Sequence, residues 1–388
     1  MSAIPAGYKQ TEVGVIPEDW GVSTVGREFE IKLGKMLDAE KNAGVPKPYI
    51  GNKAVQWNRI DTSDLPMVPM TRADIERFRL RDGDLLACEG GEVGRAAIWD
   101  NPIEECYYQK ALHRLRPLRG FDSRLMVALL KQWTERGQLV NYVTQTSIAH
   151  LPREKFVEVP MPVPPPHEQR AIATALSDMD ALLAKLDQFI SKKRDLKQAT
   201  MQQLLTGQTR LPGFGGEWEV KRLGDISPLQ RGFDLLTTRL RQGCYPVVYS
   251  NGVSSYHNEF MVKGPGVITG RSGTIGNVHY VEEDFWPHNT SLWVTSFKGN
   301  SPKFIFFLLG SIGLERFGTG SGVPTLNRND VHAHKVKVPP TPEEQTAIAT
   351  VLSYMDAEIA VLAARHSKTR ALKQGMMQEL LTGRIRLV

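Results

Sequence analysis

The sequence predicts an α+β protein of two tandem globular α/β domains, each followed by a long helix, with the two helices paired as a coiled coil. Three observations carry this prediction. One segment is repeated without gaps, the repeated segment has the composition and spacing of a long helix, and the regions between hold short strand-like runs separated by glycine-rich loops. A length of 388 residues suits two or three domains.

The internal repeat defines the order of the parts. Residues 168–211 align with residues 344–387 at an offset of 176, and 27 of 44 positions are identical. Weaker similarities upstream occur in the same order. Trp20 corresponds to Trp218, and a Gly-x-Val/Ile-Gly pattern occurs in both regions. We therefore divide the chain into a first domain (1–163), a central helix (164–211), a second domain (212–338) and a C-terminal helix (339–388), the helices being conserved between the two copies.

Each repeated segment is typical of a long helix. Proline-rich stretches precede it, neither Gly nor Pro occurs between Glu168 and Thr206, and Ala, Leu, Lys and Gln dominate. Gly207 and Gly383 are well placed to end the two helices. About 39 residues at 1.5 Å each give a rod of roughly 58 Å.

Apolar residues recur in alternating steps of four and three along both segments, which is the spacing of a coiled-coil seam. The seam positions are Ile172, Leu176, Met179, Leu183, Leu186 and Ile190 in the first segment, and Ile348, Leu352, Met355, Ile359 and Leu362 in the second. Because the two seams match, we expect the helices to pair with each other. The alternative is two surface helices, each packed on its own domain.

The regions between the helices predict short strands and tight turns. Gly266–Gly270 and Ser291–Thr295 have the length and residue types of strands. Asn251-Gly252 predicts a tight turn. Ser301-Pro302 predicts a helix start.

The sequence lacks the patterns of an enzyme, a metal site or a membrane protein. Three widely spaced cysteines form neither a disulfide framework nor a zinc site, which is typical of a reducing cytoplasm. There is no phosphate-binding G-x-x-x-x-G-K-[ST] loop and no Asn-Pro-Pro-aromatic motif of amino-methyltransferases. No uninterrupted apolar run approaches the ~18 residues that span a bilayer, and we expect no signal peptide. We therefore predict a cytoplasmic binding protein without activity, metal, cofactor or membrane contact.

The sequence does not predict a metal site at its two closely spaced histidines. His332 and His334 would share one face of a strand, but no carboxylate or cysteine completes a ligand set at suitable spacing. The net charge of +6 and pI near 9.1 permit a polyanionic partner without requiring one.

Several duplicated motifs together resemble a known family. They are the opening Thr11-Glu-Val-Gly-Val-Ile-Pro-Glu-Asp-Trp20, the Pro-Pro-x-x-Glu-Gln motifs around Glu168 and Glu344 (the second with one extra residue), and the Leu-Leu-Thr-Gly closures at Gly207 and Gly383. With these motifs the chain resembles, over nearly its whole length, the specificity (S) subunit of type I restriction–modification systems.

This resemblance implies a function in DNA recognition. Two target-recognition domains each read one half of a split double-stranded DNA sequence, and a helical spacer holds them apart. Two methyltransferase (M) subunits bind the assembly and methylate adenine at N6, and motor-nuclease (R) subunits join for restriction. S-adenosylmethionine, ATP and Mg are used by these partners. A pseudo-two-fold axis relating the domains would make the helices antiparallel and offer partners the same surface twice.

Loops with glycine and polar residues are the candidate DNA contacts. In the first domain the candidate residues are Glu89, Glu92 and Arg95, with Thr146 and Ser147 in a second loop. In the second domain they are Arg271, Ser272, Thr274 and Asn277, with Ser321 and Thr325 in the matching second loop. Arginine suits a guanine edge or a phosphate, and glutamate can accept from cytosine N4. The alternative is that these segments are plain turns between strands.

Three other functions remain open from sequence. The chain could be a DNA-modifying enzyme, against which the missing cofactor motifs argue. It could be a coiled-coil scaffold without DNA function. It could also be the specificity subunit of another restriction class, paired with a fused nuclease–methyltransferase.

Overall fold

The computed structural model describes residues 4–38, 40, 42–145, 149–319 and 323–387. The chain divides into two compact units, and each is considered by itself. The first unit is Met1–Lys185 together with His366–Val388, and the second is Leu186–Arg365. Each unit therefore holds one globular domain and a part of each long helix. The sequence-based boundaries, which treat the helices as separate parts, remain a prediction.

The first unit is built on two sheets. The four-stranded sheet has the order β10-β9-β12-β4, and the three-stranded sheet the order β11-β5-β8. The strands are β4 (Phe29–Leu33), β5 (Val45–Ile50), β8 (Met67–Met70), β9 (Leu85–Cys88), β10 (Ala96–Ile98), β11 (Tyr107–Tyr108) and β12 (Leu112–Pro117). Two-stranded pairs join β1 (Tyr8–Thr11) to β2 (Gly14–Pro17), β3 (Gly21–Thr24) to β15 (Pro160–Val163), β6 (Val55–Gln56) to β7 (Arg59–Ile60) and β13 (Thr144–Gln145) to β14 (Ala149–His150). The short helices are α1 (Val25–Glu28), α2 (Arg72–Phe78), α3 (Ser123–Glu135) and α4 (Arg153–Phe156), with 3-10 turns η1 (Asn52–Ala54) and η2 (Val140–Tyr142).

The second unit repeats this plan. Its sheets have the orders β17-β23-β20-β21 and β19-β18-β22. The strands are β17 (Leu229–Arg231), β18 (Tyr245–Tyr249), β19 (Gly252–His257), β20 (Gly266–Gly270), β21 (Val278–Val281), β22 (Trp286–Pro287) and β23 (Ser291–Val294). The pairs are β16 (Glu219–Arg222) with β26 (Lys335–Val338) and β24 (Gly318–Thr319) with β25 (Thr325–Leu326). The helices are α6 (Leu223–Ile226), α7 (Pro302–Ile312) and α8 (Arg328–Ala333), with turns η3 (Thr237–Arg239) and η4 (Leu314–Phe317).

The two domains have one topology. Both four-stranded sheets are antiparallel throughout, and both small sheets combine one parallel pair (β11–β5 and β22–β18) with one antiparallel pair. The central strands β9 and β20 are buried along their whole length, which suits their uninterrupted apolar character. The predicted strand at 266–270, the turn before Gly252 and the helix capped by Ser301 are present, and the strand predicted at 291–295 ends at Val294.

The prediction that His332 and His334 lie on one strand was wrong. His332 lies on helix α8 and His334 caps the end of that helix, so the two do not share a strand. The Nε2 atom of His332 accepts a hydrogen bond from the backbone N–H of Leu229.

Helices α5 (Pro166–Thr206) and α9 (Pro342–Leu380) contact each other within each unit. In the first unit Asp180 of α5 pairs with Lys373 of α9. In the second unit Lys193 pairs with Glu358 at 2.7 Å, and Lys197 pairs with Asp356. In the second unit, residue numbers on α9 fall as those on α5 rise, so the two helix segments there are antiparallel.

The seam residues divide into two groups by burial. Ile172, Leu176, Leu186, Ile190, Ile348 and Leu352 are buried, whereas Met179, Leu183, Met355, Ile359 and Leu362 are half-buried. Ile172 and Leu176 belong to the core of the first unit, and Ile348 and Leu352 to the core of the second. The start of each helix therefore packs on its own domain as well as on the other helix.

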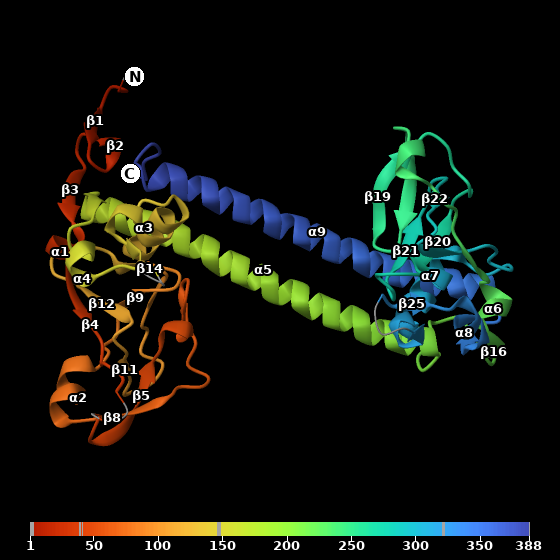
Figure 1. Ribbon diagram of the computed structural model, residues 1–388, viewed down its shortest axis with the longest axis horizontal. Helices are drawn as coiled ribbons and strands as arrows, with labels where there is room; N and C mark the ends of the chain where they lie inside the picture. The colour runs from red at the N-terminus through yellow and green to blue at the C-terminus, as the bar shows by residue number, and fades with distance from the viewer. Residues whose placement is uncertain (1–3, 39, 41, 146–148, 320–322, 388) are drawn as a thin grey trace. The chain divides into compact units, whose positions relative to one another are not determined.

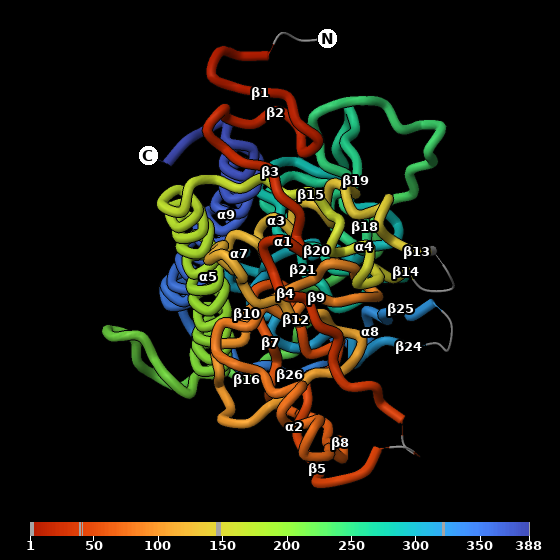
Figure 2. The backbone as a smooth tube through the Cα atoms, turned by 90° about the vertical axis from the view of Figure 1, so that its left-hand side faces the viewer, coloured from red at the N-terminus to blue at the C-terminus, as the bar shows by residue number. Residues whose placement is uncertain are grey.

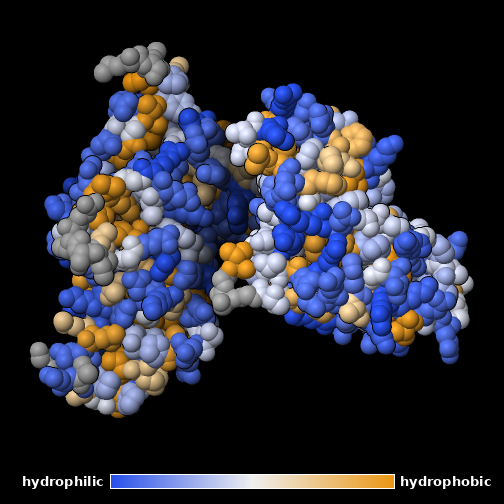
Figure 3. Space-filling model, turned by 45° about the vertical axis from the view of Figure 1, so that its right-hand side comes forward, coloured by the Kyte–Doolittle hydropathy of each residue, from blue (hydrophilic) through white to orange (hydrophobic). Residues whose placement is uncertain are grey.

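Among the described residues, α9 is long and apolar enough to cross a membrane, judged by length and composition alone. The sequence-based expectation considered only uninterrupted apolar runs, and this segment is interrupted by charged residues. The most apolar part of α9 has a mean hydropathy of 1.5, and 17% of it is buried. Two acidic residues of α9, Asp356 and Glu358, pair with lysines of α5. On the face drawn in Figure 3, apolar residues form scattered patches among hydrophilic ones.

A buried carboxylate fixes the start of α5. The Glu168 side chain is fully buried, and it accepts a hydrogen bond from Trp20 Nε1 at 2.8 Å. Arg386, just beyond α9, donates to the same carboxylate from Nε at 2.6 Å and from Nη2 at 2.7 Å. Hydrogen bonding to Glu168, and then to Asp19, raises the pKa of Arg386 and keeps it charged. We call Glu168, Trp20 and Arg386 the first lock.

The second unit contains the equivalent second lock. Glu344 is buried at the start of α9 and accepts from Arg210 Nη2 at 2.7 Å and from Trp218 Nε1 at 3.4 Å. Each lock therefore joins the start of one long helix, the residues following the other, and the opening of a domain. Figures 1 and 2 show the N-terminal strands of the first unit beside the end of α9, where the Tyr8 hydroxyl donates to the Gly383 carbonyl.

The glutamine after each lock carboxylate orients a domain helix. Gln169 Oε1 accepts from the backbone N–H of Asp122, the residue that caps α3, at 3.0 Å. Gln345 Oε1 accepts from the backbone N–H of Ser301, the residue that caps α7, at 2.9 Å. The Glu-Gln pair thus fixes each domain to its helix.

Replacement of a lock carboxylate should destabilise its unit. Glu344→Gln keeps the side-chain shape but leaves Arg210 without a charged partner, and should cost about 3 kcal/mol. The neighbouring exposed Glu343→Gln is the matched control and should stay within about 0.5 kcal/mol. Thermal unfolding and hydrogen exchange of the second unit measure the difference. Equal stability of the two variants would contradict this role.

Candidate nucleic-acid interface

A seven-residue loop occupies the same place in both domains. It joins β9 to β10 at residues 89–95 and β20 to β21 at residues 271–277. In each loop the third and sixth residues are glycines with positive φ: Gly91 and Gly94 at 76° and 83°, and Gly273 and Gly276 at 85° and 95°. Only glycine adopts this backbone readily, which explains why the Gly-x-x-Gly spacing recurs in both copies.

The second group of predicted loops lies directly beside the first. Gly90 forms a β-bridge with His150, and Ser272 forms one with Thr325. The backbone N–H of Leu151 donates to the Glu89 carbonyl at 2.8 Å, and that of Leu326 donates to the Arg271 carbonyl at 2.7 Å. The structure thus brings together, in each domain, two segments that the sequence places more than fifty residues apart.

A third segment, not predicted from sequence, completes each cluster. The N–H of Glu89 donates to the Ala111 carbonyl at 3.0 Å, and that of Arg271 donates to the Thr290 carbonyl at 2.8 Å. Lys110 and Asn289 therefore stand at equivalent positions beside the loops. No sequence motif marks them; only the strand register does.

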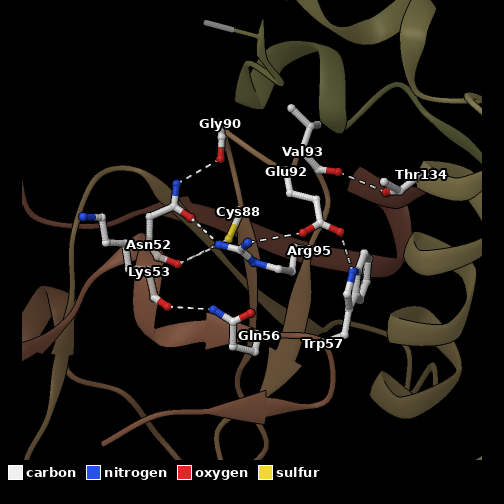
Figure 4. A network of polar contacts seen from close by, with 10 residues as sticks. All are labelled: Asn52, Lys53, Gln56, Trp57, Cys88, Gly90, Glu92, Val93, Arg95 and Thr134. Atoms are coloured by element: carbon white, nitrogen blue, oxygen red, sulfur yellow. Dashed lines mark hydrogen bonds and ion pairs between the residues drawn. The ribbon is translucent and has the colours of Figure 1, made fainter. Parts of the chain in front are cut away.

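Glu92 points toward Arg95 and Trp57, and Arg95 points toward Asn52 (Figure 4). Arg95 Nη2 donates to the Asn52 carbonyl at 3.1 Å, and Nη1 pairs with Glu92 at 3.3 Å. Glu92 in turn accepts from Trp57 Nε1 at 2.7 Å. Asn52 Nδ2 donates to the Gly90 carbonyl at 2.9 Å, so this network holds the loop in place. The predicted DNA contacts of Glu92 and Arg95 remain untested, and the contacts seen are internal.

The Glu89 side chain is half-buried and lies near Lys110 and His150. Burial raises the pKa of its carboxyl above the ordinary value, while nearby His150 and Lys110 act in the opposite direction. Lys110 and His150 are themselves exposed. A carboxylate, an ammonium and an imidazole are thus gathered at one edge of the first domain.

The second domain carries different chemistry at this edge. Arg271 is half-buried, and its Nη1 donates to the Asn289 carbonyl at 3.4 Å. The side chain of Asn289 donates to Asp234, which also pairs with Arg231 at 2.9 Å. Thr274 and Asn277 are exposed, and Ser272 and Thr325 are half-buried. Thr146, Ser147 and Ser321 lie outside the described residues.

The polar groups in these clusters are of the kinds that bind polyanions and contact base edges. Arginine, lysine and backbone amides suit phosphates, whereas Arg, Asn and Glu present the donors and acceptors that distinguish base pairs in the major groove. Within the described residues, no group of three His, Cys, Asp or Glu is arranged to hold a metal ion.

Comparison with known proteins identifies the family. The pattern described as "Type I restriction modification DNA specificity domain" matches residues 17–193 and again residues 215–368. This chain belongs to that specificity-domain family. The two matches agree with the internal repeat, and membership supports a specificity component rather than a catalytic one.

Two of the similar curated proteins are named as specificity subunits of type I restriction enzymes. A putative type I restriction enzyme MjaX specificity subunit from Methanocaldococcus jannaschii is 23% identical over 98% of this chain and 97% of its own length. The EcoKI specificity subunit of Escherichia coli is 24% identical over 65% of this chain and 53% of its own length.

Two solved structures share the fold. The type I S subunit of M. genitalium has a TM-score of 0.65 at 18% identity and covers 93% of this chain and 96% of that one. A chain from a structure described as concerning complex assembly and conformational transition of the type I R-M system has a TM-score of 0.58 at 14% identity, covering 95% and 99%. The two tandem α/β domains of the predicted fold class are thereby confirmed.

The inward network predicts a structural role for Arg95. Arg95→Gln removes the charged partner of Glu92 and should lower the stability of the first unit by about 2 kcal/mol. Hydrogen exchange should accelerate in residues 89–95. Arg59→Gln, an exposed arginine of β7, is the control and should leave exchange unchanged; similar exchange in both variants would contradict the role.

Proposed function

We propose that this chain is the DNA-recognition subunit of a type I restriction–modification complex. Each domain reads one half of a bipartite sequence, and the helical spacer of α5 and α9 separates the halves. The observation that carries the proposal is the pair of equivalent domain edges with different polar side chains: Glu89, Lys110 and His150 in one, Arg271, Asn289 and Thr325 in the other. One fold with two side-chain sets suits two different half-sites.

We further propose that two methyltransferase subunits bind this chain and methylate adenine at N6, and that motor-nuclease subunits join them for restriction. S-adenosylmethionine, ATP and Mg then belong to those partners, and the chain itself uses no cofactor. Partners that act on chromosomal DNA imply a cytoplasmic location. Exposed apolar residues on α9, such as Tyr354 and Val361 at 75% and 68% exposure, favour a protein partner along this helix.

A groove in the first unit supports this partnership. It has a volume of about 310 Å³ and lies where α3 meets α5 and α9. Its lining includes Asp100, Arg124, Ser177 and Asp180, and Asp180 pairs with the buried Lys373. The groove therefore presents both acidic and basic side chains to a partner.

The second unit carries the equivalent groove, of about 620 Å³. It is lined by Glu282, Lys303, Ser353 and Asp356, and Asp356 pairs with Lys197. Ser353, Asp356 and Lys197 stand in the internal repeat where Ser177, Asp180 and Lys373 stand in the first unit. A surface presented twice with the same polar groups fits a partner that binds as two identical copies.

Domain exchange tests the reading function. The 212–338 region of a relative should replace one half-site in the adenine-methylation map of cells that carry this chain and its methyltransferase, and leave the other half-site and its spacing intact. Independent domains on one spacer require this result. A map in which both half-sites change, or neither does, would refute the proposal; exchange of 1–163 serves as the reciprocal control.

Groove blocking tests the partner stoichiometry. Ser177→Arg and Ser353→Arg each insert a bulky cation into one groove and should reduce the complex from two methyltransferase copies to one. Sedimentation or native mass spectrometry measures the ratio. Gln202→Arg, exposed on α5 outside both grooves, should retain two copies. If both groove variants also retain two, the grooves are not the docking sites.

A further inference from the structure

We infer that three structurally equivalent positions in each domain form its base-reading set: Glu89, Lys110 and His150 in the first domain, and Arg271, Asn289 and Thr325 in the second. The inference deepens the proposed function and rests on it. Lys110, His150 and Asn289 carry no sequence motif, and their assignment comes from backbone geometry.

The equivalence follows from the strand register. Leu112 pairs with Cys88 in the first sheet, and Ser291 pairs with Gly270 in the second. Parallel bridges link Lys35 to Gln109 and Phe233 to His288. Lys110 and Asn289 each follow the bridged residue, so they occupy equivalent positions in the two domains. The bridges of Gly90 to His150 and of Ser272 to Thr325 set the third position.

The central position of each set is held from both sides. Glu89 donates its N–H to Ala111 and accepts from Leu151 through its carbonyl, and Arg271 is held in the same way by Thr290 and Leu326. The backbone is thereby fixed, while the side chain stays half-buried rather than enclosed. Fixed backbone with a variable side chain is the arrangement that base reading requires.

The central side chains predict different bases. A glutamate only accepts, so Glu89 suits a base with an amino group in the major groove, cytosine N4 or adenine N6. Arg271 suits the O6 and N7 acceptors of guanine, which it can contact with two parallel hydrogen bonds. The second half-site should therefore contain a guanine at the Arg271 position.

At the second position of the second domain, the side chain is oriented by a neighbouring carboxylate. Asp234 accepts from the Asn289 side-chain amide and from Arg231, and so sets the orientation of the amide. An oriented asparagine matches N6 and N7 of adenine. Asp234 is thus a positioning residue, whereas Lys110 at the first-domain position is exposed and suits a guanine or a phosphate.

The hydrogen bonds of the first-domain loop show that this edge is more than a structural turn. Glu92 and Arg95, in the same first-domain loop, are engaged with Trp57 and Asn52. The chain thus uses some loop side chains for support and leaves Lys110 and His150 exposed beside Glu89.

The test is an adenine-methylation map from cells that carry the full chain with its own methyltransferase partner. Glu89→Gln should relax one base position in one half-site, with discrimination falling about ten- to one-hundred-fold. Arg271→Lys keeps the charge but loses the double hydrogen bond, and should relax the guanine position of the other half-site only. Lys110→Ala and Asn289→Ala are second variants of the same sets and should alter the same half-sites.

Matched controls are the exposed Glu76→Gln and Arg222→Lys, which should leave the motif unchanged. Unchanged motifs in both Glu89→Gln and Arg271→Lys would overturn the inference. Uniformly weaker methylation with an unaltered motif would also overturn it, because that result indicates phosphate contacts. If the unmodified chain yields no bipartite motif, the proposed function itself fails; a bipartite motif that these variants do not change defeats only the base-reading set.

Discussion

The rest of the structure depends on the hydrogen bonds made by the buried glutamate at the start of each long helix. Glu168 and Glu344 receive an arginine that follows the opposite helix and a tryptophan that opens the domain. A carboxylate removed from water is costly unless charged and neutral donors surround it, so the geometry of all three parts is constrained together. The adjacent glutamine extends this constraint to the cap of a domain helix.

Because the constraint occurs twice, the two domains can differ elsewhere without losing their attachment. The locks and the repeated helices are nearly the same in both units, and the sheets share one topology. The loop edges carry a carboxylate in one domain and a guanidinium in the other at the same backbone position. This separation of a fixed support from a variable edge is what a two-part reader of DNA needs.

Sequence predicted the long helices and several strands because their signals are local: proline and glycine boundaries, seam spacing and the buried run at 266–270. It could not predict that Arg386 reaches Glu168, because that contact joins residues at distant places in the chain. Lys110 and Asn289 were missed for the same reason, since only strand register brings them to the loops. The inward direction of Arg95 depends on Asn52, another distant residue.

The most direct test of this account is a double-mutant cycle between Glu168 and Arg386, measured by unfolding of the full chain. Glu168→Gln, Arg386→Gln and the double variant give the coupling free energy. A lock that constrains the fold predicts coupling in the upper part of the range of about 0.5–3 kcal/mol seen for contacting residues. Additive effects of the two substitutions would mean that the carboxylate and the guanidinium act independently, and would contradict the central claim.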